Sequence, residues 1–92
     1  KYKEQGAQID VLIDRRDQTI NLCEMKYAAA EYEITRAYHK KLMSRRELFR
    51  QQTKTRKALY LTMITTHGIS QNRYAGDIQS EVTMGDLFYT SL

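Results

Sequence analysis

The fold is decided by residues 7–27, which read AQIDVLIDRRDQTINLCEMKY. Apolar and polar residues alternate over residues 7–13 and again over residues 20–27, with the two-residue period of a β-strand. The polar residues 15–18 between these runs are typical of a turn. We therefore predict an antiparallel hairpin over residues 7–27.

The charged residues of this hairpin constrain its register. Residues directly opposite each other in an antiparallel pair lie on the same face, so Asp10 and Glu24 share a face only if paired residue numbers have an even sum. A sum of 34 puts Asp10 opposite Glu24 and centres the turn on Asp17, whereas a sum of 36 puts Asp10 opposite Lys26. Either register requires an odd-length loop or a bulge. We expect Asp10, Glu24 and Lys26 on one surface of the sheet.

A long helix and a third strand follow the hairpin. Thr35 is a candidate N-cap, with apolar Ile34 before it, and apolar residues then recur at steps of three and four, which predicts a helix over residues 35–53. The run ALYLTMITT at residues 58–66 predicts a strand. In the C-terminal segment 76–92 we expect a strand or an extended stretch, followed by a short helix capped by Thr83.

These elements predict one small α/β or α+β domain. A mixed sheet begins with the antiparallel hairpin, one long helix packs on the sheet, and the following strand lies parallel to a partner after a right-handed crossover. Ninety-two residues are too few for two independent cores. The chain opens without Met or a signal peptide, so we expect residues 1–92 to be a C-terminal fragment of a longer protein.

Composition also bears on location. The longest apolar runs have about four or five residues, whereas a bilayer requires about 20, so we expect no membrane segment. Cys23 is the single cysteine and cannot form an internal disulfide. A cytoplasmic location is the expectation.

Positive charge is concentrated in one segment. Residues 36–57 contain nine basic side chains and one acidic one, a net charge of +8, whereas residues 1–35 and 58–92 each carry −2. This distribution predicts a surface that faces a polyanion. The alternative is a solvated helix face without a partner.

Two carboxylates on one sheet surface are candidate metal ligands. Opposed side chains have Cβ atoms about 4.5–5.5 Å apart, and two carboxylates at this spacing can share one Mg²⁺ or Mn²⁺. Lys26 lies two residues beyond Glu24 on the same face, where its ammonium group can position water or neutralise phosphate charge. The alternative is a cross-strand salt bridge between Lys26 and Asp10.

The charged residues carry a resemblance to a known family. Asp10, then thirteen residues, then Glu24-Met25-Lys26, followed by a basic helix and a strand, resembles the PD-(D/E)XK nuclease superfamily. The stretches GAQIDVLIDR, INLCEMKY and TKTRKALYLTMITTHG are similar to the C-terminal nuclease-like domain of bacterial proteins whose N-terminal part is an AAA-type ATPase. The likeness runs from about Gly6 to Phe88. Ile9 stands where the superfamily has a proline.

The resemblance implies a truncated restriction-endonuclease-like core with a metal-dependent DNA nuclease site, joined to an ATPase domain in the parent chain. In it, Asp10 and Glu24 bind Mg²⁺ or Mn²⁺ together with the main-chain carbonyl of Met25, and Lys26 is the catalytic lysine. The basic helix offers its polar face to nucleic acid, with DNA as the expected partner. The candidate nucleic-acid-binding residues are Lys40, Lys41, Arg45, Arg46, Arg50 and Lys54.

One departure from the superfamily affects the expected assembly. The superfamily core begins with a helix and a strand ahead of the aspartate hairpin, but only nine residues precede Asp10 here. We expect that helix to be missing or supplied by another chain, and the exposed apolar face or edge of the sheet to invite a homodimer or domain swapping.

Two function classes therefore stand side by side. One is the metal-dependent nuclease. The other is a catalytically silent module of the same fold that anchors the ATPase to nucleic acid or protein. The sequence contains no Gly-rich phosphate-binding motif, and two histidines with one cysteine do not make a structural zinc site within one chain.

Overall fold

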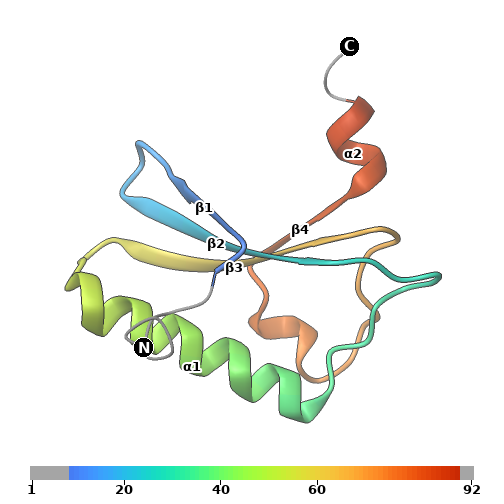
Figure 1. The fold of residues 1–92 in the computed structure, drawn as a ribbon, viewed down its shortest axis with the longest axis horizontal. Coiled ribbons are helices and arrows are strands. Elements are labelled where there is room, and N and C mark those ends of the chain that lie inside the picture. The colour runs from blue at the N-terminus through green and yellow to red at the C-terminus, as the bar shows by residue number, and fades with distance from the viewer. Residues whose placement is uncertain (1–8, 90–92) are drawn as a thin grey trace.

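A computed structural model describes residues 9–89 and arranges them as a four-stranded sheet with one long helix along one face (Figure 1). The chain order begins with the hairpin strands and alternates afterwards between helical and extended segments. The elements are β1 Val11–Asp14, β2 Thr19–Lys26, α1 Arg36–Thr53, β3 Ala58–Thr65, a 3₁₀ turn at Ala75–Asp77, β4 Ser80–Thr83 and α2 Met84–Tyr89.

The strands lie in the order β1-β2-β3-β4, so β2 and β3 are the inner strands. β1 pairs antiparallel with β2 and places Leu12 opposite Leu22, which is the predicted register with a sum of 34. β3 pairs parallel with β2, with Leu61 beside Leu22, and β4 continues the sheet in the same direction. The predicted mixed sheet, its hairpin and its long helix are confirmed, and β4 adds a second parallel strand.

Local hydrogen bonds explain the bounds of the hairpin and of α1. The turn closes where the Arg15 amide donates to the Thr19 carbonyl at 2.8 Å, with Gln18 at a φ of 64°. α1 begins where the Thr35 hydroxyl accepts from the Tyr38 amide at 3.2 Å, as predicted for an N-cap. It ends at Lys54, whose left-handed backbone, with a φ of 56°, stops the helix.

The C-terminal segment combines both expected elements. Residues 80–83 form the edge strand β4, and the Thr83 hydroxyl accepts from the Asp86 amide at 3.2 Å. The Asp86 carboxylate accepts from the Thr83 amide, also at 3.2 Å, and this reciprocal pair caps α2. Residues 7 and 8 of the predicted hairpin and residues 90–92 lie outside the described residues.

The hydrophobic core lies between α1 and the sheet. Side chains alternate along each strand, so one set from β2 and one set from β3 face the helix. The core residues from these elements are Ile20, Leu22, Tyr38, Leu42, Leu59, Leu61 and Met63, joined by Ile34, Ile69 and Ala75 from the connecting segments.

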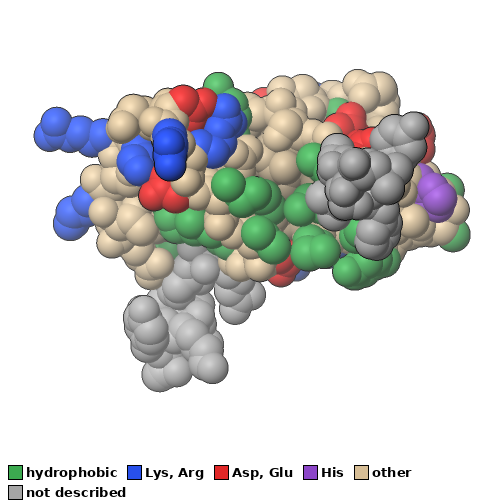
Figure 2. Space-filling view, turned by 90° about the horizontal axis from the view of Figure 1, so that it is seen from above, with side chains coloured by type: hydrophobic (Ala, Val, Ile, Leu, Met, Phe, Trp, Pro, Cys, Tyr) green, Lys and Arg blue, Asp and Glu red, His purple; other side chains and the backbone are tan. Residues whose placement is uncertain are grey.

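The opposite face of the sheet carries exposed apolar side chains. Val11, Ile13 and Tyr60 are between 37% and 48% exposed, and Figure 2 shows hydrophobic side chains gathered in the middle of this face. The predicted exposure of an apolar sheet surface is therefore present, whereas the homodimer stays a prediction.

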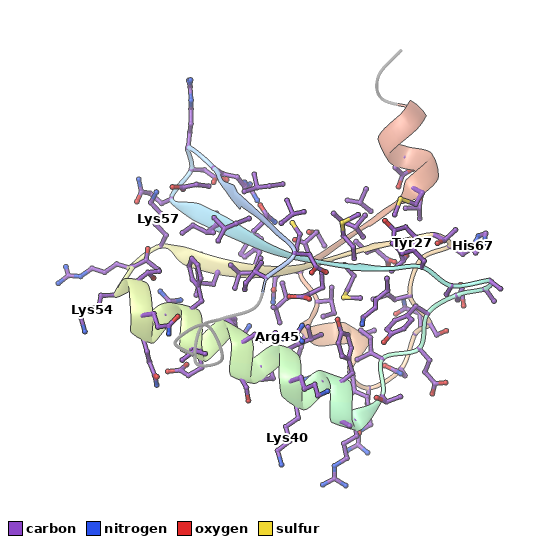
Figure 3. All side chains as sticks on the ribbon, viewed as in Figure 1. Tyr27, Lys40, Arg45, Lys54, Lys57 and His67 are labelled. Carbon is purple, nitrogen blue, oxygen red and sulfur yellow. The ribbon has the colours of Figure 1, made fainter. Side chains whose placement is uncertain are left out.

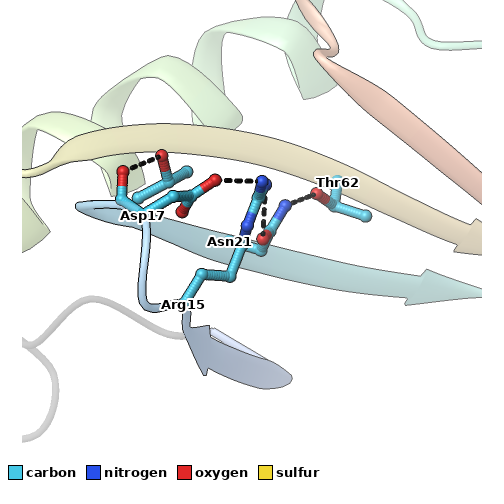
Figure 4. Close-up of polar contacts among 5 residues, drawn as sticks. Arg15, Asp17, Asn21 and Thr62 are labelled. Carbon is cyan, nitrogen blue, oxygen red and sulfur yellow. Dashed lines mark hydrogen bonds and ion pairs between the residues drawn. The ribbon is translucent and has the colours of Figure 1, made fainter.

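A row of polar side chains crosses the same face near the hairpin turn (Figure 4). The Asn21 amide donates to the Thr62 hydroxyl at 2.8 Å, and Thr62 shares a hydrogen bond of 2.8 Å with Ser80. Arg15 contacts Asn21 at 3.4 Å and forms an ion pair with Asp17. These contacts satisfy the polar groups of the inner strands and join three strands side by side.

None of the helices in the part of the chain that the structure describes is both long enough and apolar enough to cross a membrane.

The packing predicts unequal effects of two leucine substitutions that face each other across β1 and β2. Leu22 is fully buried, whereas Leu12 is 46% exposed. Leu22→Ala should lower the free energy of unfolding by about 2–5 kcal/mol, because it leaves a cavity under α1. Leu12→Ala, the matched control, should lower it by less than about 1 kcal/mol. Denaturant unfolding monitored by circular dichroism measures both values, and equal losses would contradict this placement of the core.

Candidate functional site

Asp10 is held against the carboxyl-terminal end of β2 by a side-chain hydrogen bond. Its Oδ2 accepts from the backbone amide of Met25 at 2.9 Å. The backbone pairing of β1 with β2 begins one residue later, at Val11 and Cys23. The carboxylate of Asp10 therefore contacts the residue that separates Glu24 from Lys26.

Glu24 is a buried carboxylate with a cationic partner from the helix. Its side chain is 5% exposed, and Nη1 of Arg45 donates to Oε1 at 2.8 Å. Arg45 belongs to α1, and Figure 3 shows its position between the helix and the sheet. The ion pair thus bridges α1 and β2 at the site.

The electrostatic surroundings of Glu24 include the other two residues predicted to form the site. Burial raises the pKa of Glu24 above its ordinary value, and the negative charge of Asp10 acts in the same direction. Arg45 and Lys26 act in the opposite direction on this pKa, because positive charge favours the ionised form. The structure therefore brings Asp10, Glu24 and Lys26 together, as the even-sum register predicts.

Tyr38 adds an unpaired hydroxyl to this group. Its side chain is 9% exposed, and its Oη is buried with no hydrogen-bond partner among the described residues. Burial and the negative charge of Glu24 raise its pKa, so the hydroxyl keeps its proton and stays a donor. The ammonium group of Lys26 lies 4.7 Å from the centre of the Tyr38 ring, a cation–π contact.

We call Asp10, Glu24, Lys26, Tyr38 and Arg45 the β2-end cluster. The sequence predicted its first three members; it placed Tyr38 around the site as a boundary-packing residue with no part in the chemistry, and it assigned Arg45 to nucleic acid. A signal for both was present, because residues 38, 42 and 45 follow the three- and four-residue steps of the apolar stripe. An arginine on a buried stripe indicates a carboxylate opposite it.

The predicted nucleic-acid-binding residues divide into two groups. Lys40, Lys41 and Lys54 are exposed, and Figure 3 shows Lys40 and Lys54 extending from α1. Arg50 instead donates from Nη1 to the carbonyls of Thr55 and Lys57, at 2.9 and 2.8 Å, and secures the turn after α1.

The remaining two arginines also have partners within the chain. Arg46 contacts the sulfur of Met43, three residues earlier on α1, at 3.3 Å. Arg45 is bonded to Glu24 and is 27% exposed. Among the six candidates, the cations that face solvent most freely are therefore the lysines.

A shallow hollow lies beside the β2-end cluster on α1. Its volume is about 480 Å³, and its described lining consists of Ala37, Lys40, Lys41, Ser44 and Arg45. Three of these five side chains are cationic and none is acidic, while most of the surface that they turn to the hollow is apolar. Arg45 is the residue that belongs to both the hollow and the cluster.

The donor set of the cluster fits a divalent cation. Mg²⁺ is commonly held by one or two carboxylates, with water and substrate phosphate completing its ligands, and Asp10 and Glu24 supply two carboxylates at the same end of β2. Within residues 9–89, no group of three or more His, Cys, Asp or Glu side chains gathers around one point. The hydroxyl of Tyr38, which has no partner among the described residues, supplies a further hydrogen-bond donor for a polar ligand.

Comparison of the chain with protein-family models, with curated proteins and with solved structures found no match.

The burial of Glu24 predicts a pH dependence of stability. Because its pKa in the folded protein is above the ordinary 4.5, the folded protein binds this proton more tightly than the unfolded chain does. Protonation of Glu24 therefore stabilises the folded protein, and this stabilisation is lost as the pH rises through the pKa of Glu24 in the folded state. The free energy of unfolding of the wild type, relative to Glu24→Gln, should therefore decrease as pH rises from about 4 to about 7.

Denaturant unfolding of the two proteins at each pH measures this difference and cancels the contributions of other groups. The side-chain amide introduced by Glu24→Gln retains an oxygen that accepts from Arg45, so the comparison isolates the charge. If the free energy of unfolding of the wild type instead rises relative to that of Glu24→Gln as pH increases, the pKa of Glu24 is not raised by burial.

Proposed function

We propose that the chain is a metal-dependent phosphodiesterase of the PD-(D/E)XK type, a DNA nuclease domain joined to an ATPase in its parent protein. The observation that carries this proposal is the hydrogen bond from the Met25 amide to the Asp10 carboxylate. It holds a carboxylate of one hairpin strand beside the Glu24-Met25-Lys26 segment of the other.

The topology supports the same interpretation. The aspartate lies just before the first hairpin strand, and the glutamate and lysine lie on the second. α1 then crosses to β3, which pairs parallel with β2 along its whole length from Thr19 to Lys26. Glu24 and Lys26 therefore lie at the carboxyl end of an inner strand, beside a helix that carries six basic side chains and one acidic one.

Each member of the site has a distinct part in the proposed reaction. Asp10 and Glu24 would hold Mg²⁺ or Mn²⁺, with the Met25 carbonyl as a third ligand, and the bound ion would activate water and neutralise phosphate charge. Lys26 provides an ammonium group two residues from Glu24, where it stabilises negative charge that develops on the phosphate. Its contact with the Tyr38 ring restrains the lysine side chain.

The exposed lysines of α1 support contact with the nucleic-acid backbone. Lys40 and Lys41 line the hollow beside the cluster, and Lys54 extends from the far end of the same helix. Positive side chains along one helix bind phosphates without reading the base sequence. The basic helix would thus hold a strand near Asp10 and Glu24.

A catalytically silent binding module is the second candidate, and one observation favours it. Arg45 already balances the charge of Glu24, so this buried carboxylate is compensated without a metal ion. In that case, the same fold would anchor the ATPase to nucleic acid through α1. A wild-type chain that binds DNA without cleaving it would be the silent module, whereas the nuclease would both bind and cleave DNA.

For the nuclease, we predict that Asp10→Asn abolishes Mn²⁺-dependent cleavage, with a loss of at least about 100-fold. The asparagine oxygen still accepts from the Met25 amide, so the fold is retained while the charge is removed. Asp14→Asn is the matched control, because Asp14 is an exposed aspartate four residues along the chain that pairs with Lys57. The assay follows fluorescently labelled single-stranded and duplex DNA on denaturing gels.

Cleavage that survives Asp10→Asn would refute the assigned site. Cleavage absent from the wild type and from both variants would refute the nuclease proposal for this chain and favour the silent module.

For DNA binding, we predict that Lys40→Gln combined with Lys41→Gln weakens affinity and reduces its salt dependence. The slope of log affinity against log salt should become shallower by about 0.9 for each duplex phosphate that the protein no longer neutralises. Lys57→Gln is the control, because Lys57 is paired with Asp14 and lies beyond the end of α1. Fluorescence anisotropy in Ca²⁺ or EDTA measures the slopes, and an unchanged slope in the double variant would contradict this interface.

A further inference from the structure

Arg45 lies between two environments. On one side, its Nη1 donates to Oε1 of the buried Glu24 carboxylate at 2.8 Å. On the other side, it lines the cationic hollow with Lys40, Lys41 and Ser44. Its side chain is 27% exposed, compared with 5% for Glu24, so the arginine is the more accessible partner of the pair.

Glu24 requires a positive partner whenever it is ionised in the folded protein. An ionised carboxylate buried without a counter-charge is strongly destabilising. Arg45 provides the partner in the structure, because Lys26 lies over the Tyr38 ring and forms no ion pair with Glu24 among the described contacts. A divalent cation bound by Glu24 would supply the same compensation, so the cation and Arg45 compete for one carboxylate.

The Arg45 side chain itself would lose little free energy if it were released from Glu24. Arginine has a long flexible stem and a guanidinium group that stays charged and well solvated at the surface. The hollow that it already lines is open to solvent and is bordered by Lys40 and Lys41, whose ammonium groups could assist a phosphate that Arg45 binds there. The planar fork of an arginine side chain can bind two phosphate oxygens at once.

We propose that Arg45 is a positioning residue that exchanges partners: it holds Glu24 in the metal-free protein and turns to the substrate phosphate in the hollow when a divalent cation binds. This inference rests on the proposed metal site at Asp10 and Glu24. The exchange couples the two ligands, because the cation frees the guanidinium group that then binds the phosphate.

Calorimetric titration of Mn²⁺ into the wild type, Arg45→Gln and Arg46→Gln tests the competition. Arg45→Gln should bind Mn²⁺ about tenfold more tightly than the wild type, because the charged hydrogen bond from Arg45 to Glu24 no longer has to be broken. Arg46→Gln is the matched control, because it removes the same charge from the adjacent position, where Arg46 contacts Met43. Its affinity should equal that of the wild type within about twofold.

A measurement on the wild type makes the test independent of the folding of any variant. In an NMR titration with diamagnetic Mg²⁺, the side-chain Nε resonance of Arg45 should shift on saturation as its bond to Glu24 is broken. The Nε resonance of Arg46 should stay in place.

The outcomes separate this inference from the proposed function. Mn²⁺ binding of equal or lower affinity in Arg45→Gln, or an Arg45 resonance that stays fixed at saturating Mg²⁺, would overturn the exchange and leave the metal site standing. No saturable binding in any of the three proteins would overturn the metal site, and the exchange with it.

Discussion

Side chains of β2 point alternately toward α1 and away from it, and this alternation determines how the helix and the sheet pack together. Ile20 and Leu22 face the helix and are buried in the core, so the next positions on that face, Glu24 and Lys26, also point toward α1. Two charged side chains thereby enter the interface between helix and sheet. The pairing of Glu24 with Arg45 and the stacking of Lys26 on Tyr38 resolve this conflict.

The apolar layer, rather than the ion pair, accounts for the stability of this interface. Leu22, Leu42 and Leu61 are almost fully buried, and each such side chain contributes about 1.5–3 kcal/mol by leaving water. A buried ion pair gains little, because desolvation of both charges offsets their attraction. Burial of Glu24 and the unpaired hydroxyl of Tyr38 both cost stability. Polar groups held at such a cost are expected at a functional site.

Local patterns predicted much of the fold and the carboxylate pair. The spacing of Asp10 and Glu24 led to the even-sum register, and Thr35 marked the start of α1; both depend on neighbours in sequence or across one hairpin. The partner of Arg45 depends on the packing of α1 against β2, 21 residues away, and sequence periodicity alone does not specify it. For the same reason, Arg50 was predicted as a nucleic-acid contact, although its guanidinium group binds the carbonyls that follow α1. The homodimer and the ATPase partner stay predictions.

We propose above that Asp10 and Glu24 together hold a divalent cation. Calorimetric titration of Mn²⁺ into the wild type, Glu24→Gln and Glu47→Gln tests it most directly, because Glu47 is an exposed glutamate on α1 that serves as a charge-matched control. We expect saturable binding to the wild type and to Glu47→Gln, and its loss in Glu24→Gln. Equal binding by all three proteins, or binding by none, would contradict it.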